Sequence, residues 1–507
     1  MNYKYSPPLI RSYNGVGNNL QNPRWGSVEE PFIRLTSFAY KDGISEPSGM
    51  DRLNARLISN TVCKQINSIL NSRGLSDLTG VWALFLSHTL QSFRPAEPEE
   101  QFGILVPEND PVFEPGTTIP LARWIYDVST GQFPINPRRQ LNNTTSYLDA
   151  SVVYGIDSTR AGALREFKNG LMKTSDQNLL PFNTFGLPNR VPGPNFFLAG
   201  DDRANTSFGL AALHTLFVRE HNRLANEILE TNPNFNDEEI YQRARKLVSA
   251  QIQVITYNEF LPALLGPNAP SGLTSYDSNI NATISEIFSV VGFRFGHSML
   301  SPYFILLYEN GDEKLIMQRN SFFNPDIIKV NGLEPVFRGL VSQSMQEIDE
   351  KIVDDIRNQT IRFGQNIDLL AYDIQSGREF GIPDYNRVRQ DVGLLPVQSF
   401  NEITSNVNLQ KILQNVYGDV NQIDPLIGGL AEDHLPNCSL GPLLTKIIVE
   451  QFERLRKGDR FWYENDSTLS TKDIAYLKDT TLAKIICRNT NIPNIQENVF
   501  FSTGTKF

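Results

Sequence analysis

Helical periodicity in long, partly apolar segments is the sequence feature that most constrains the fold. In residues 208–230 the apolar side chains recur at intervals of three and four, which places them on one stripe of an α-helix. The same pattern recurs in residues 236–257, 283–299, 443–455 and 471–487. Alternation of apolar and polar residues, which is typical of strands, is rare and short. The sequence therefore predicts a mostly α fold with long loops and little β structure.

The domain organisation follows from what the chain lacks. Its 507 residues show no internal repeat, no low-complexity linker and no break in composition. We therefore predict a single large domain over residues 1–507, in which residues 1–50 form an extended N-terminal arm. Loops rich in Pro and Gly lie between the helices, most clearly in residues 94–120 and 179–200. Loops of that length in a compact domain are usually functional or packed around another group.

Charge and cysteine content exclude some classes of protein. Lys and Arg number 46 and Asp and Glu number 56, so the net charge is −10, which argues against a nucleic-acid partner. The three cysteines, Cys63, Cys438 and Cys487, do not make a disulfide framework, so we expect reduced thiols. The first 21 residues lack the apolar segment of a signal peptide, and no run of 18 apolar residues predicts a membrane span. We expect a cytoplasmic or unconventionally secreted protein.

Two of the five histidines lie in contexts that suit chemistry. His88 shares a helix face with Val81 and Phe85, which places its imidazole among apolar side chains. His297 directly follows Gly296, which has no side chain and so lets a flat group approach the backbone. The alternative for both is a hydrogen-bonded histidine in the core.

A haem group is the cofactor that two such histidines and an arginine suit well. Haem iron takes a neutral imidazole on one side. The other side needs a base that takes a proton from hydrogen peroxide and returns it to the departing oxygen. It also needs a fixed positive charge where negative charge develops, and arginine stays charged when desolvated. The motifs of zinc hydrolases, dinucleotide-binding proteins, phosphate-binding loops and α/β-hydrolases are all missing from the sequence.

Five segments in a fixed order carry a family resemblance. They read TSYLDASVVYG, LHTLFVREHNRLA, FRFGH, GIPDYN and GDRFWYEN, at residues 145–155, 213–225, 293–297, 381–386 and 458–465. Together they resemble the animal-type haem peroxidases, the superfamily that contains myeloperoxidase, lactoperoxidase, peroxidasin and the cyclooxygenases, in its bacterial branch. The resemblance covers residues 11–501, and it implies one large helical domain around a buried haem.

The resemblance implies roles on the proximal side of the haem. His297 would be the iron ligand, and Asn386 would accept a hydrogen bond from its other ring nitrogen. Arg294 and Arg389 would pair with the haem propionates. The alternative for Asn386 is a turn residue beside Pro383, and the alternative for the arginines is structural ion pairing.

The resemblance also implies two residues on the distal side. His88 would be the acid–base residue, and Arg203 would be the distal cation. The alternative for Arg203 is a surface salt bridge with Asp201 or Asp202. The other three histidines do not match haem-contacting positions, so we interpret them as packing and loop residues: His214, His221 and His434.

Several departures from the family pattern bear on the cofactor. Well-studied mammalian members carry two carboxylates that form esters with the haem, and this chain has Ser87 and Thr206 at those positions. A methionine that forms a sulfonium link in myeloperoxidase is Ser207 here. The haem is therefore predicted to be a non-covalent haem b. Leu84 replaces a glutamine associated with halide binding, so we expect weak halide oxidation.

The family's calcium loop is recognisable but reduced in charge. The ligands implied by the resemblance are Thr145, the carbonyl of Tyr147, Asp149 and Ser151. Oxygen ligands at alternating positions suit Ca²⁺. Thr89 replaces a family aspartate, so one carboxylate is left, and the site would hold calcium weakly or a monovalent ion. The alternative is a plain Ser/Thr-rich turn before a helix.

Three hypotheses for the function remain at this point. The first is a haem peroxidase that reduces hydrogen peroxide and oxidises small organic or halide donors. The second is a haem fatty-acid dioxygenase of the same superfamily, which needs a tyrosine three residues before the proximal histidine, where this chain has Arg294. The third is a non-enzymatic interaction or adhesion protein. The sequence does not indicate the oligomeric state or the physiological donor.

Overall fold

A computed structural model describes residues 9–272, 275–360 and 366–504. The described α-helices are α1 (Ala55–Val62), α2 (Asp77–Leu90), α3 (Ser151–Tyr154), α4 (Ser158–Leu164), α5 (Phe208–Thr231), α6 (Asp237–Ile255), α7 (Leu261–Leu265), α8 (Gln318–Ser321), α9 (Asp326–Asn331), α10 (Glu334–Ser342), α11 (Asp354–Arg357), α12 (Leu369–Glu379), α13 (Tyr385–Asp391), α14 (Val407–Tyr417), α15 (Pro425–Ala431), α16 (Pro442–Lys457), α17 (Thr471–Lys478) and α18 (Leu482–Asn489). Long loops join them, and the mostly α prediction is confirmed.

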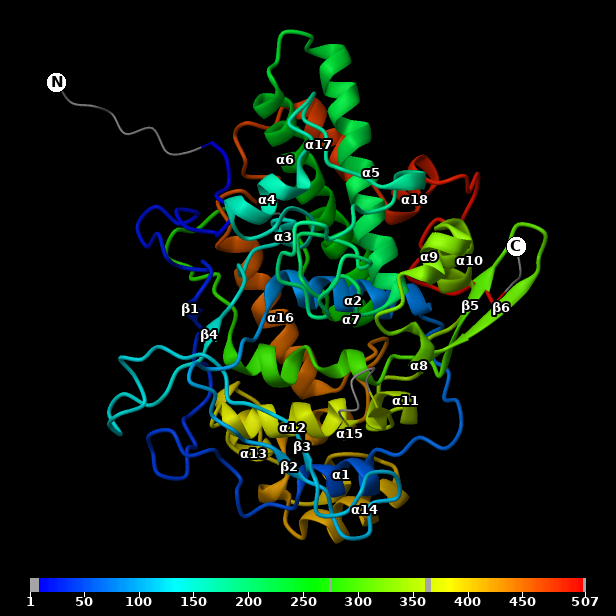
Figure 1. Cartoon of the computed structure of the whole chain (residues 1–507). Coiled ribbons are helices and arrows are strands. Elements are labelled where there is room, and N and C mark those ends of the chain that lie inside the picture. Colours follow the sequence, from blue (N-terminus) through cyan, green and yellow to red (C-terminus); the bar gives the residue numbers. More distant parts are fainter. Residues whose placement is uncertain (1–8, 273–274, 361–365, 505–507) are drawn as a thin grey trace, which may run out of the picture.

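Strands are few and short in the described residues. They form four two-stranded antiparallel sheets, β1–β4, β2–β3, β5–β6 and β7–β8. Their bounds are β1 (Glu30–Pro31), β2 (Ile104–Leu105), β3 (Thr118–Ile119), β4 (Leu141–Asn142), β5 (Tyr303–Leu307), β6 (Glu313–Met317), β7 (Gln359–Thr360) and β8 (Asn366–Ile367). The β5–β6 hairpin projects from the body of the molecule (Figure 1).

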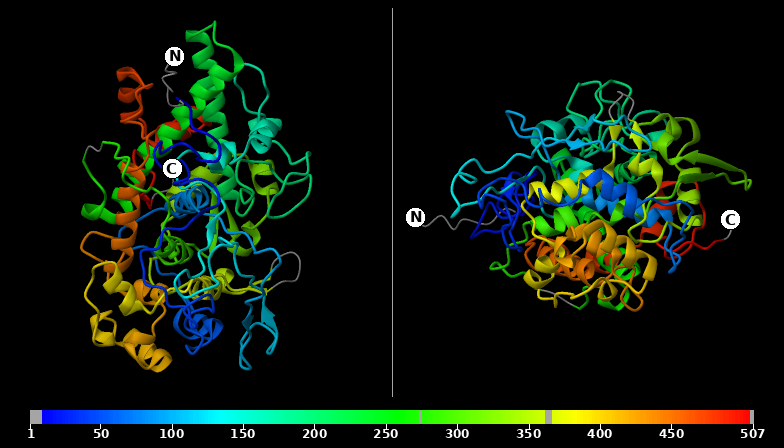
Figure 2. Two further views of the ribbon diagram at one scale, coloured as in Figure 1. Left: turned by 90° about the vertical axis from the view of Figure 1, so that its left-hand side faces the viewer. Right: turned by 90° about the horizontal axis from the view of Figure 1, so that it is seen from below.

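Helix α2 occupies the centre of the molecule and packs against α5 and α10 (Figure 1). Helices α5 and α6 rise together on one side of it, and α12 and α15 lie on the other. The helices from α13 to α16 gather on one face, while the long loops before α5 cover the opposite face (Figure 2). The central position of α2 agrees with its composition, because nearly every one of its side chains is buried.

Two predicted helices form as the periodicity indicates. The apolar stripe of α5 is buried against its neighbours. Helix α6 begins with a capping box, in which the Asn236 side chain accepts from the backbone of Glu239 and the Glu239 carboxylate accepts from the backbone of Asn236. Segment 471–487 instead forms two helices, because Thr481 caps a new helix start at α18.

The segment 283–299 departs most from the predicted regular helix. It forms a π-helix, η4 (Phe288–Gly292), followed by a short 3-10 helix, η5 (Phe295–His297). Gly292 touches α16 so closely that a Cβ there would lie 2.4 Å from a methyl group of Ile447. The wider π turn accommodates this close approach, and π turns are frequent at functional sites.

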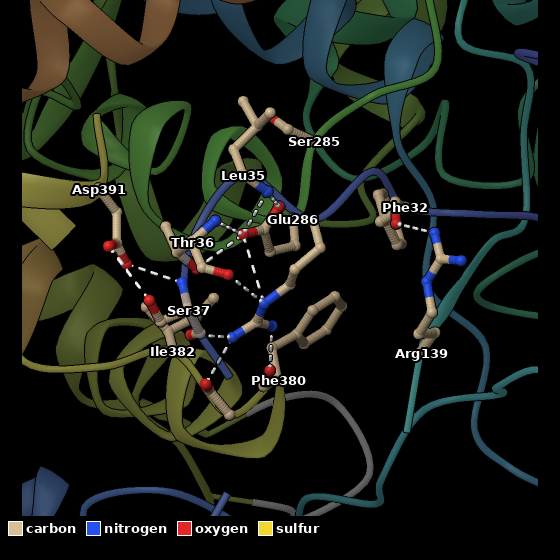
Figure 3. Close-up of polar contacts among 12 residues, drawn as sticks. Phe32, Leu35, Thr36, Ser37, Arg139, Ser285, Glu286, Phe380, Ile382 and Asp391 are labelled. Carbon is tan, nitrogen blue, oxygen red and sulfur yellow. Dashed lines mark hydrogen bonds and ion pairs between the residues drawn. The ribbon is translucent and has the colours of Figure 1, made fainter. Parts of the chain in front are cut away.

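The N-terminal arm is held by buried hydrogen bonds rather than by helix packing (Figure 3). The Glu286 carboxylate, just before η4, accepts from the backbone N–H groups of Leu35 and Thr36 and from the Thr36 hydroxyl. Arg34 donates to the carbonyls of Phe380 and Gly381, each at 2.6 Å. The arm therefore fastens the segment before η4 to the end of α12.

The three cysteines are free thiols. None of the described helices combines the length and the apolar composition that a bilayer crossing requires.

The arm gives a first testable prediction. Glu286→Ala should lower the free energy of unfolding by about 3 kcal/mol, because it leaves three donors without their buried acceptor. Chemical denaturation followed by circular dichroism measures the change. The control is Glu309→Ala, an exposed glutamate that should change stability by less than about 0.5 kcal/mol. Equal stability of the two variants would contradict the assigned role of the arm.

Candidate active site

The two histidines singled out in the sequence lie on neighbouring elements in the middle of the molecule. His88 occupies the last turn of α2, and His297 ends η5, which packs against α2. His88 is buried, with 7% of its surface exposed. The His297 side chain keeps 22% of its surface exposed although the core surrounds it.

The exposure of His297 reflects space that the surrounding side chains do not fill. A Cβ added at Gly296 or at Gly377 would meet no atom within 4 Å. Leu84 and Ser87, on the neighbouring α2, are also only half-buried. Small residues beside a histidine, a side chain that can bind iron, leave room for a flat group. The surroundings of His297 therefore fit a haem.

His297 has one well-defined hydrogen-bond partner. Its Nδ1 lies 2.6 Å from the Asp373 carboxylate on α12. An ionised carboxylate only accepts, so Nδ1 carries the hydrogen and Nε2 is the nitrogen left to bind a metal. Asp373 also lies 3.4 Å from the guanidinium of Arg294.

The prediction that Asn386 supports His297 is wrong in this structure. Its side-chain nitrogen donates to the carbonyl of Val397, and its oxygen accepts from the backbone N–H of the same residue, both at 2.8 Å. These bonds fasten the loop after α13, so Asn386 is a loop-anchoring residue. Asp373 was missed, although a carboxylate on a helix face with the buried Leu370 and Ile374 is itself a signal.

The two proximal arginines differ in their surroundings. Arg294 donates to the carbonyl of Ser289 and lies beside Asp373, with 17% of its side chain exposed. Arg389 forms an ion pair with Glu432. Its expected role at a haem propionate is therefore not supported. The ion pair with Glu432 agrees with the alternative, a structural role for Arg389.

A further cation approaches the site from the long loop before α5. Arg190 lies against Tyr372, the residue that precedes Asp373 on α12. Sequence reasoning flagged this loop as functional but had no signal that singled out Arg190.

Arg203 is held against the end of α2 on the other side of the site. Its Nη1 and Nη2 donate to the carbonyls of Gln91 and His88, each at 3.0 Å. Its Nε and Nη2 donate to Asp201 at 2.9 and 2.6 Å. The ion pair with Asp201 is thus present, but it is largely buried and places the guanidinium beside His88.

The electrostatics of this pair suit acid–base chemistry. Burial, helped by the charge of Arg203, lowers the pKa of His88 well below its ordinary value. The imidazole is therefore neutral near pH 7 and free to take a proton. Burial opposes the charge of Arg203, but Asp201 outweighs it and raises the pKa of the guanidinium.

The predicted calcium-loop residues converge only in part. The Thr145 hydroxyl donates to the Asp149 carboxylate at 2.7 Å, and the backbone N–H of Ser151 donates to it at 2.9 Å. The Ser151 hydroxyl lies 3.5 Å from the carbonyl of Thr89. Burial raises the pKa of Asp149. No group of three or more His, Cys, Asp or Glu residues with metal-binding geometry occurs in the described ranges.

The Tyr147 side chain and two further histidines, His214 and His221, are buried in the core. The Tyr147 hydroxyl donates to the carbonyl of Trp25 at 2.7 Å. His221 accepts from Tyr154 and donates to a backbone carbonyl, each at 2.8 Å, as a hydrogen-bonded core residue does. His214 is fully buried, and its ring meets the ring of Phe85 edge-on.

Comparison with known proteins decides the family. The family model described as animal haem peroxidase matches residues 10–500. The chain belongs to the animal haem peroxidase family. It is therefore an oxidoreductase that acts on hydrogen peroxide with a haem cofactor and oxidises a donor substrate.

Individual relatives agree with this assignment. The chain is 36% identical to peroxinectin A of Dictyostelium discoideum, over 97% of this chain and 95% of that protein. It is 32% identical to mouse myeloperoxidase, over 98% of this chain and 76% of that protein. Human peroxidasin homolog is 33% identical over 97% of this chain, which spans only 37% of the peroxidasin. These relatives come from an amoeba and from animals, so the predicted bacterial branch is not supported.

Solved structures agree as well. Peroxidase A from Dictyostelium discoideum superposes with a TM-score of 0.90 at 35% identity, over 97% of this chain and 99% of that one. A fatty acid α-dioxygenase from Arabidopsis thaliana gives a TM-score of 0.86 at 20% identity, over 99% of this chain and 85% of that one. At that identity the likeness shows a common fold alone.

The proximal hydrogen bond gives a second prediction. Asp373→Asn should weaken haem binding by about tenfold to a hundredfold, because such partners orient an iron ligand and set its basicity. It should also raise the reduction potential, since a less basic imidazole favours ferric iron less. Haem titration and spectroelectrochemistry measure the two effects.

The matched control is Asn386→Ala, which should lower stability and leave the haem spectrum and potential unchanged. A shifted spectrum in the Asn386 variant, together with an unchanged one in the Asp373 variant, would mean that Asn386, and not Asp373, supports His297.

Proposed function

We propose that the chain reduces hydrogen peroxide at a non-covalently held haem b, with His297 as the iron ligand and with His88 and Arg203 acting on the peroxide. The observation that carries this proposal is the placement of the two histidines on adjoining elements, beside space that small residues leave open. When bound, haem supplies an iron that accepts the oxidising equivalents of hydrogen peroxide.

His88 would act as the base and then as the acid. A neutral buried imidazole takes the proton from the oxygen of peroxide that approaches the iron, and returns it to the oxygen that leaves. The lowered pKa of His88 favours this role, because it keeps the base unprotonated at neutral pH. Arg203 would stabilise the negative charge that develops as the O–O bond breaks, and its clamp on α2 keeps it in place without reorganisation.

The side chains at the two ester positions support a non-covalent haem. Ser87 accepts a hydrogen bond from the Gln91 amide at 3.0 Å, and Thr206 donates to the carbonyl of Arg203 at 2.7 Å. Neither carries a carboxylate that could form an ester. Leu84 lines the same side with an apolar surface, which supports small organic donors over halides.

Arg294 would bind one haem propionate. Of the two predicted proximal arginines, it is the one that lies beside Asp373, the partner of His297. Its bond to Asp373 would hold the guanidinium in place. Arg294 also occupies the position at which a dioxygenase of this superfamily needs a tyrosine, so the fatty-acid hypothesis gains no support from the site. The retained His88, Arg203 and His297 likewise speak against a purely adhesive role.

The calcium loop would bind its cation weakly. The Thr145 hydroxyl lies against the Asp149 carboxylate, and Ser151 follows two residues later, so oxygens that suit a hard cation lie near one another. A single carboxylate limits the affinity, and the internal hydrogen bonds of Asp149 compete with the ion.

A third prediction tests the role of His88. His88→Ala should retain haem and slow the reaction with peroxide by about 10²- to 10⁴-fold, as the loss of a general base does. Stopped-flow absorbance at the Soret band measures the rate. His434→Gln is the control, because the His434 ring bonds to the carbonyl of Ile348 and not to a residue assigned to the site, so this variant should react as the wild type does. A wild-type rate in the His88 variant would refute the proposed role.

The link between protein and haem is tested separately. Acid–acetone should extract the haem into the organic phase. Haem that stays with the precipitated protein would reveal a covalent bond and contradict the inference from Ser87 and Thr206.

A fourth prediction concerns the calcium loop. Thr89→Asp adds a second carboxylate beside Ser151 and should tighten calcium binding at least about tenfold, since affinity follows ligand charge. Isothermal titration calorimetry measures the affinity. Thr89→Asn has the same shape without the charge and serves as the control. Equal affinities of both variants and the wild type would mean that these oxygens do not form a cation site.

A further inference from the structure

Asp201 touches both residues of the distal pair. Its carboxylate accepts from Nε and Nη2 of Arg203 and from the backbone N–H of the same residue at 2.8 Å. One carboxylate oxygen also lies 3.5 Å from Nδ1 of His88. The backbone N–H of Asp201 donates to the carbonyl of Val152, which fixes the residue against α3. Sequence reasoning treated Asp201 only as a salt-bridge partner.

The position of Asp201 bears on which nitrogen of His88 carries the proton. Nδ1 is buried and has no hydrogen-bond partner within the described part of the chain. The Asp201 carboxylate lies just beyond bonding distance, so a small rotation of the ring completes a hydrogen bond. An ionised carboxylate only accepts, so Nδ1 must carry the hydrogen and Nε2 keeps its lone pair. A proton acceptor on the far side of the ring needs that tautomer.

The charge state of Asp201 supports this arrangement. Burial alone would raise its pKa, but Arg203 and His88 outweigh burial and hold the pKa well below its usual range. The carboxylate is therefore ionised throughout the working pH range. Its charge raises the pKa of His88, while Arg203, His214 and Arg294, the other charged or titratable groups that face His88, lower it.

Asp201 also borders a cavity of about 290 Å³ between α3, α4 and the loop before α5. Asp202 and Arg160 line the same cavity. Asp202 differs in geometry, because it lies 3.7 Å from Arg203 and is 46% exposed. Asp202 is therefore a suitable control for Asp201, because it is a neighbouring carboxylate near Arg203 that does not contact His88.

We propose that Asp201 is a positioning residue for the distal pair, which orients the Arg203 guanidinium and fixes the proton of His88 on Nδ1. The inference rests on the proposed function of His88 and Arg203. A purely structural Asp201 would affect stability alone. A positioning residue also changes how readily His88 takes a proton.

The experiment compares haem-loaded Asp201→Asn, Asp202→Asn and wild type by cyanide binding and by the reaction with peroxide. Hydrogen cyanide binds iron as the anion, so its on-rate reports proton transfer to the distal base without turnover. We expect Asp201→Asn to keep its haem and to bind cyanide and react with peroxide about tenfold to a hundredfold more slowly. Asp202→Asn should match the wild type in both rates.

The pH profile separates positioning from structure. Removing the Asp201 charge lowers the pKa of His88 further, so unprotonated His88 persists to lower pH. The acid limb of the peroxide reaction should therefore move to lower pH in Asp201→Asn. Asp201→Glu retains the charge, so it should recover part of the rate and keep an acid limb like that of the wild type.

Each outcome decides between the proposals. If Asp201→Asn shows wild-type rates and a wild-type pH profile, the positioning role is wrong while the role of His88 stands. If the wild-type protein itself fails to react with peroxide, the proposed function is wrong.

One measurement needs no variant of Asp201. Histidine ¹⁵N chemical shifts in the diamagnetic ferrous carbonyl complex report the tautomer of His88, with the signal assigned through His88→Gln. A proton on Nδ1 supports the proposal even where the Asp201 variants fold poorly. A proton on Nε2 overturns it.

Discussion

The hydrogen bond between His297 and Asp373 is the contact on which the site depends. It fixes the ring orientation of the imidazole and leaves Nε2 directed away from α12. Two irregular features lie in the segment that leads to His297. The π turn of η4 lets Gly292 press against α16, and the N-terminal arm fastens the start of this segment through Glu286.

The two sides of the site place opposite demands on their carboxylates. Asp373 serves a histidine that must bind a metal, so it shares its charge with Arg294 and keeps the imidazole a good ligand. Asp201 lies beside a histidine that must gain and lose a proton. Its carboxylate is paired mainly with Arg203 and lies farther from His88. In both cases an arginine stabilises the buried carboxylate, and its positive charge offsets part of the electrostatic effect of that carboxylate on the histidine.

The sequence predicted the regular helices and the two histidines but not the partners of those histidines. Helices such as α5 and α6 follow from periodicity and capping, which are local properties. The π-helix η4 depends on a contact with Ile447, over 150 positions away, so no local pattern contains it. Asn386 was predicted because it belongs to a recognisable motif, whereas Asp373 is recognisable only as a buried charge on α12. The expected place of Arg389 at a propionate is not supported, because its partner Glu432 follows α15, 43 positions away, and no local pattern indicates that contact.

The hydrogen bonds of the N-terminal arm also bear on how the molecule assembles. The arm is synthesised well before its partners Glu286, Phe380 and Gly381, which lie some 250 to 350 positions later in the sequence. Contacts between such distant positions form slowly, because a large loop must close before they contribute stability. Until then the first strand-forming residues and the incomplete core stay exposed to other chains. The hydrogen bonds that join the arm to Glu286 and to the end of α12 should therefore form late in folding, and the proximal side of the site should be completed with them.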